Sequence, residues 1–215
     1  DTCRERAEVR AGGRIPLTVT ALRHDDFDGP IEVRVEDLPP GLSATRATIL
    51  PGQVSTVLLL SADSEARLKD AVPLRVSGTG AGLTRHASAD DPLKLISVIP
   101  KPDIVMHAET KEVRLEPGAT AEVKVRISRN NDFGGRVPVI VTNLPPGVRV
   151  LDVGLNGVLI NETENERSFT LEALSSAQPV EQDVVVSGNV ETRAGGQQTL
   201  YAAEPVRLKV VPRRQ

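Results

Sequence analysis

Residues 27–42 read FDGPIEVRVEDLPPGL, and residues 133–148 read FGGRVPVIVTNLPPGV. Half of the aligned positions are identical, among them Phe27 and Phe133, and both stretches contain Leu-Pro-Pro-Gly. The two copies lie 106 residues apart, which is about the size of one small domain. Self-similarity at a fixed spacing is typical of repeated modules. The sequence therefore predicts two copies of one domain in tandem, over residues 1–100 and 101–215.

Alternating apolar residues predict the strands of each copy. The matched runs are 15–21 and 121–127, 31–35 and 137–141, 44–49 and 148–153, 54–60 and 168–173, 72–77 and 184–187, and 93–99 and 206–211. Glycine and proline turns separate these runs, and no segment has a sustained helical period. About seven short strands per copy predict an all-β fold class of two tandem Ig-like (Greek-key) antiparallel β-sandwiches. Pro100 and Pro102 form a short, stiff spacer between them.

The same alternation predicts which side chains fill the cores. Six valines are expected to be buried: Val19, Val33, Val35, Val125, Val139 and Val141. Phe27 and Phe133 are expected as large core anchors, so replacing either with alanine would cost about 3–5 kcal/mol. Tyr201 is expected to be an edge or packing residue. Val-Ser-Gly recurs at a spacing of 110, and we assign the four extra residues to the polar loop Asn161–Arg167.

Composition excludes several classes of function. The net charge of −3, with both signs interspersed, gives no basic surface for nucleic acid. No apolar run approaches the ~20 residues that cross a bilayer, so no membrane insertion is expected. With no Trp and one Tyr, the chain lacks an aromatic platform for stacking on sugars or single-stranded nucleic acid. Cys3 is the single cysteine, so it is either an incidental thiol or pairs with a residue outside this fragment.

A search for catalytic motifs finds none. The chain has no G-x-S-x-G turn for a serine nucleophile and no glycine-rich phosphate loop. His24, His86 and His107 do not recur at equivalent positions, and no pair is spaced for zinc. Paired carboxylates for glycoside hydrolysis stay open, because such pairs are distant in sequence. We predict that this fragment is not an enzyme, although the parent protein could carry a hydrolase domain.

One acidic loop is a candidate metal site. Asp25, Asp26 and Asp28 precede Gly29, and closely spaced carboxylates beside a glycine suit calcium. The competing interpretation is a tight turn, because Asp and Asn bond their own backbone there. The second copy carries Asn130 and Asn131 in this loop and so has fewer charges. Arg23 and Arg129 are expected to pair with the Asp that follows them. No other cofactor is expected.

The repeated string resembles a family of bacterial Ig-like modules. It runs from Arg23 through Asp26-Phe27-Asp28-Gly29 to Leu38-Pro39-Pro40-Gly41, and from Arg129 through Asp132-Phe133-Gly134-Gly135 to Leu144-Pro145-Pro146-Gly147. Such modules are repeated in large secreted or surface proteins, often beside peptidase, glycosidase or prepeptidase C-terminal domains. The resemblance implies a non-catalytic accessory role and carries over no active site.

Two functions stay open at this point. The first is a structural or interaction module, a spacer or protein-binding Ig-like repeat, within a larger exported bacterial protein. The second is a ligand-binding accessory module, for calcium or glycan, of a secreted peptidase or glycosidase. The expected partners are neighbouring domains of the same polypeptide or another protein, and the expected location is secreted, periplasmic or cell surface. Because the chain starts at Asp1, we interpret it as an excised piece or a mature form.

Overall fold

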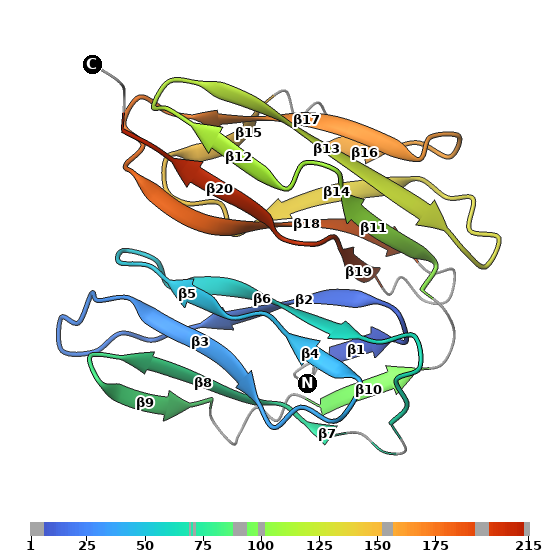
Figure 1. Ribbon diagram of the computed structural model, residues 1–215, viewed down its shortest axis with the longest axis horizontal. Coiled ribbons are helices and arrows are strands. Elements are labelled where there is room, and N and C mark those ends of the chain that lie inside the picture. The colour runs from blue at the N-terminus through green and yellow to red at the C-terminus, as the bar shows by residue number, and fades with distance from the viewer. Residues whose placement is uncertain are drawn as a thin grey trace. The chain divides into compact units, whose positions relative to one another are not determined.

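The computed structural model describes residues 7–68, 70, 72–87, 94–98, 102–151, 157–191 and 198–212. All regular elements among them are β-strands, so the predicted all-β fold class is confirmed (Figure 1). The chain divides into two compact units, Asp1–Pro102 (unit one) and Asp103–Gln215 (unit two).

Unit one is a β-sandwich whose two main sheets enclose one core, with a small third sheet. Its strands are β1 (Ala7–Arg10), β2 (Arg14–Thr20), β3 (Ile31–Glu36), β4 (Leu42–Ala44), β5 (Ala47–Ile49), β6 (Ser55–Ala62), β7 (Val72–Pro73), β8 (Arg75–Gly80), β9 (Leu83–His86) and β10 (Lys94–Val98). One sheet has the order β2-β6-β4, the second has the order β5-β3-β8-β9, and the small third sheet has the order β1-β10-β7. Leu17 and Leu60 of the first sheet lie in one buried cluster with Val33 and Val76 of the second.

Unit two repeats this plan. Its strands are β11 (Ile104–Ala108), β12 (Glu112–Leu115), β13 (Thr120–Arg129), β14 (Val137–Thr142), β15 (Val148–Leu151), β16 (Val158–Ile160), β17 (Glu166–Ala173), β18 (Val180–Glu191), β19 (Gln198–Ala202) and β20 (Val206–Val210). The sheets are β11-β13-β17-β15 and β12-β20-β18-β14-β16, with β19 also paired to β18. Val125 and Leu171 of one sheet share a buried core with Val186 and Leu208 of the other. Alternation places these side chains inward on both sheets, which is why the strand pattern predicts the sandwich.

The third predicted run of unit one, 44–49, is divided between its two main sheets, whereas β16 in unit two lies beyond the predicted run 148–153. In unit one, β4 pairs with β6 and β5 pairs with β3. In unit two, β15 pairs with β17 and β16 pairs with β14. Thr45 lies between the two halves in unit one, where its hydroxyl accepts a hydrogen bond from the Leu59 amide at 2.9 Å. In unit one the chain thus changes sheets within one apolar run, a change that alternation alone does not reveal.

The location predicted for the extra residues of the second copy is wrong. Ile31 pairs with Ile49 and Val137 pairs with Ile160. The first members of these pairs are 106 residues apart, whereas the second members are 111 apart. The additional residues therefore precede Val158, and the loop Asn161–Arg167 is no longer than its counterpart in unit one. The prediction failed because the spacing between two distant motifs gives the number of extra residues but not their place between the motifs. Residues 152–156, which precede Val158, lie outside the described residues.

In each unit one strand near the start pairs in parallel with the last strand, β1 with β10 in unit one and β12 with β20 in unit two, unlike the other described strand pairs. In unit one, Ala7 of β1 pairs with Leu95 of β10, and the pairing continues to Arg10 with Val98. In unit two, Glu112 of β12 pairs with Arg207 of β20, and the pairing continues to Leu115 with Val210. The sequence predicted only antiparallel pairing, because β1 and β12 have four residues each and fall below the length at which alternation is recognised. This pair joins the last strand to the first strand of unit one and to the second strand of unit two, which follows β11.

The predicted core valines face inward, to different depths. Val33, Val125 and Val139 are buried, as predicted. The other three pack against the cores but are only half-buried: Val19, Val35 and Val141. Tyr201 is a packing residue of the unit-two core, with 2% of its surface exposed.

Candidate functional site

The predicted site residues lie in the loops at one end of each unit, which we call the loop pole. In unit one the loop pole contains loop 21–30 after β2, loop 50–54 between β5 and β6, and the β8–β9 hairpin (Figure 1). In unit two it contains loops 130–136 and 161–165. The acidic residues of the calcium hypothesis belong to the loop pole of unit one.

Two residues of each loop have left-handed backbone and form a tight turn. Asp25 and Asp26 have φ values of 54° and 56°, and the Phe27 amide donates to the His24 carbonyl at 3.1 Å. Asn131 and Asp132 have φ values of 52° and 55° in the matching turn of unit two. Asp and Asn are the non-glycine residues that best tolerate this conformation. The Asp and Asn residues thus have a local structural role in both units.

The Arg23 guanidinium ties together two loops of the unit-one loop pole. It donates to the Gly29 carbonyl at 2.6 Å, within its own loop. It also donates to the carbonyls of Leu50 at 3.0 Å and Gln53 at 3.2 Å, in the next loop. A planar guanidinium can satisfy several carbonyls at fixed angles, so one side chain fixes the spacing of both loops.

Arg129 does the same in unit two. It donates to the carbonyls of Gly135 at 2.5 Å, Asn161 at 2.8 Å and Glu164 at 3.1 Å. It also donates to the side chain of Asn165 at 3.2 Å. The predicted pairing with the following Asp is replaced by these backbone contacts. In unit one, Asp28 does lie near Arg23, but at 3.8 Å.

Phe27 and Phe133 close the loop poles and are not the core anchors that the sequence predicted. Each ring lies beside the arginine of its own loop, with the guanidinium carbon 5.7 Å and 5.6 Å from the ring centroid. A Cβ added to Gly29 would lie 2.6 Å from the Phe27 ring, so the ring rests directly on that backbone. Both rings are half-buried, and only Phe133 packs against a core cluster. Their truncation should therefore cost less than the ~3–5 kcal/mol expected of a fully buried Phe.

The calcium hypothesis gains no ligand cluster. Asp28 accepts a hydrogen bond from the Gly52 amide at 2.7 Å, which occupies one of its oxygens. No group of three or more His, Cys, Asp or Glu side chains in the described part of the chain is placed to hold a metal ion. A calcium site at Asp25, Asp26 and Asp28 stays a prediction.

We expect calcium to leave the melting temperature of unit one unchanged. Ligand binding at a hundred times its dissociation constant would add about 2.7 kcal/mol, which raises the melting temperature by several degrees in a domain of ~100 residues. The measurement is a thermal melt of the chain in chelator and in millimolar calcium. A rise that disappears in the variant Asp26→Asn would show that the acidic loop does bind the ion.

A second polar cluster joins β3, β8 and β9 of unit one. Glu36 accepts hydrogen bonds from the Ser77 hydroxyl at 2.8 Å and from Arg34 at 2.9 Å, and it lies 3.6 Å from His86. A nucleophilic serine would give its proton to the histidine, whereas Ser77 donates to the carboxylate and is 1% exposed. This cluster crosslinks three strands and does not have the geometry of a serine nucleophile.

The pKa of Glu36 gives the cluster a pH dependence. The hydrogen bond from Ser77, followed by hydrogen bonding and charge attraction from Arg34, holds the pKa of Glu36 below its usual value. A carboxylate with a lowered folded pKa stabilises the fold above its unfolded pKa, and this contribution disappears as the pH falls through the folded pKa.

We therefore expect Glu36→Gln to lower the free energy of unfolding at pH 7 and to have little effect at a pH below the lowered pKa of Glu36. Urea unfolding followed by circular dichroism at both pH values measures the difference. Glu32→Gln, on the exposed face of the same strand, is the matched control. An equal loss at both pH values would assign the effect to packing and not to the charge.

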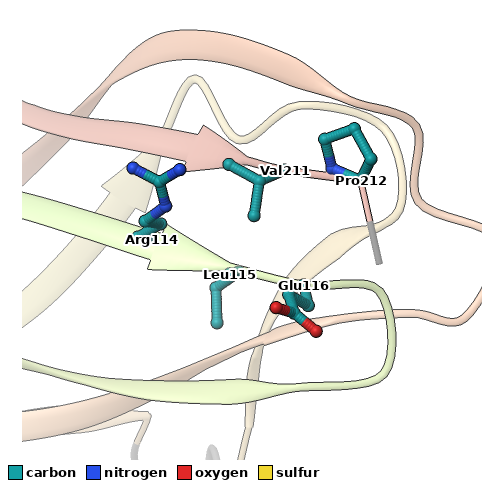
Figure 2. A pocket seen from close by; sticks show the side chains of 5 residues that line it. All are labelled: Arg114, Leu115, Glu116, Val211 and Pro212. Atoms are coloured by element: carbon teal, nitrogen blue, oxygen red, sulfur yellow. The ribbon is translucent and has the colours of Figure 1, made fainter. Parts of the chain in front are cut away.

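One shallow pocket lies in unit two, where β12 and β20 end. It encloses about 360 Å³ between Arg114, Leu115, Glu116, Val211 and Pro212. Figure 2 shows the charged groups of Arg114 and Glu116 on either side of Leu115. The lining offers one cation, one anion and an apolar floor, and it contains no histidine, cysteine or hydroxyl group.

Among known proteins, the chain is similar to solved structures at low sequence identity. No family model and no curated protein sequence matches the chain. Domains 4 and 5 of the S-layer protein SbsC are 13% identical, with a TM-score of 0.34 over 89% of this chain and 81% of that one. A protein of unknown function from Porphyromonas gingivalis W83 is 14% identical, with a TM-score of 0.33 over 95% and 96%. Fibronectin(III)-like modules of CbhA from Clostridium thermocellum are 12% identical, with a TM-score of 0.28 over 99% and 92%.

At such identities and TM-scores the likeness carries no conclusion about function.

The described residues include no helix of the length and apolarity that a membrane span requires.

Proposed function

We propose that the chain is a non-catalytic structural module, two Ig-like sandwiches in tandem that space and orient neighbouring parts of a larger exported bacterial protein. The supporting observation is that the last strand of each unit pairs in parallel with a strand near its start, β10 with β1 and β20 with β12. Since parallel strands point the same way, the chain enters at one end of the pair and leaves at the opposite end. Each unit therefore lengthens the polypeptide path by its own long dimension.

The same pairing suits a module under tension. In unit two, β12 begins at Glu112 beside Arg207, and Val211 at the far end donates its amide to the Leu115 carbonyl at 2.8 Å. Force applied through the two ends of unit two reaches β12 by way of β11, which is paired with β13, and it pulls β12 past β20 along their length. All hydrogen bonds of the pair then share the load and must break together, which resists opening more than breaking them one at a time.

The loop poles add a second support. Arg23 and Arg129 each fix two loops through several hydrogen bonds, and Phe27 and Phe133 cover them. Loops that bind ligands are commonly mobile, whereas these loops are fastened to one another. Export is supported by the resemblance of the repeated motif to modules of secreted and surface proteins.

Single-molecule stretching tests the proposal. Pulling the chain by its two termini should give two unfolding events, each releasing ~100 residues or about 350 Å of extended chain. In the control, force is applied to unit two between Glu112→Cys and Arg207→Cys, in a background where Cys3 is replaced by Ser. These residues face each other at the start of the parallel pair, so the pair is unzipped and unit two should open at a lower force. Equal forces in the two geometries would contradict the proposal.

A further inference from the structure

We draw no further inference here: the strongest candidate, the patch on the outer face of β14, β18 and β19 in unit two, where Ile140, Val185 and Ala202 point away from the unit's own core, carries no proposal because nothing in the structure shows what covers it.

Discussion

Arg129→Ala is expected to lower the free energy of unfolding of unit two by about 2–4 kcal/mol. Hydrogen bonds to a charged donor contribute ~1.5–3 kcal/mol each when partly buried, although the remaining carbonyls recover some bonding from water. Arg129 contributes several such bonds and connects two loops. Urea unfolding followed by tyrosine fluorescence reports unit two alone, because Tyr201 is the chain's one tyrosine and there is no tryptophan.

Arg126→Ala is the matched control on the same strand. Arg126 forms an ion pair with Glu109 at 2.8 Å, and both side chains are nearly half exposed. Exposed pairs of this kind contribute about 0–1 kcal/mol. Arg129→Lys should lose most of what Arg129→Ala loses, since an ammonium group cannot reach both loops. If Arg126→Ala lowers the free energy of unfolding as much as Arg129→Ala does, the connection between the two loops does not stabilise unit two more than an exposed ion pair does.

Gly147→Ala is expected to cost unit two about 2–4 kcal/mol. Gly147 ends the Leu-Pro-Pro-Gly motif with a φ of +81°, where a non-glycine residue pays about 1–2 kcal/mol. An added Cβ would also lie 2.9 Å from the Ala177 Cα, and a backbone atom cannot move aside as a side chain can. The Leu-Pro-Pro-Gly turn and the loop after β17 that carries Ala177 would have to move apart.

Gly118→Ala separates the two causes. Gly118 has a φ of +86°, but an added Cβ there would have no heavy atom within 4 Å. This variant should cost only the conformational penalty of about 1–2 kcal/mol. The same urea unfolding measures both variants, and equal losses would show that contact with Ala177 is unimportant.

The sequence predicts the fold well wherever a strand is long and alternating. The runs around Val33 and Val139 identify β3 and β14 almost to the residue. Short or polar strands give no such signal. β9 reads Leu-Thr-Arg-His and is exposed throughout, so only its hairpin with β8 makes it a strand.

The loop pole was only partly predictable. Arginine, phenylalanine and glycine recur at the same spacing in Arg23…Phe27…Gly29 and in Arg129…Phe133…Gly135, which indicates a shared local structure. The decisive contacts of Arg23 go to the carbonyls of Leu50 and Gln53. A carbonyl is present on every residue, so the sequence cannot identify these acceptors. The core-anchor prediction for the two phenylalanines failed for the same reason, because their partners are glycine backbone and guanidinium.

The pairing of the last strand with β1 in unit one and with β12 in unit two also constrains how each unit folds during synthesis. Residues Glu112 and Arg207 are direct partners although they lie ~95 residues apart in the chain. Unit two therefore cannot complete its fold until nearly all of its residues have left the ribosome. Until then β12 has no strand partner and the core side chains that it covers stay exposed. Contacts between residues so far apart in the chain also form slowly. Unit one can close as soon as β10 emerges, so the two units should fold in the order of their synthesis.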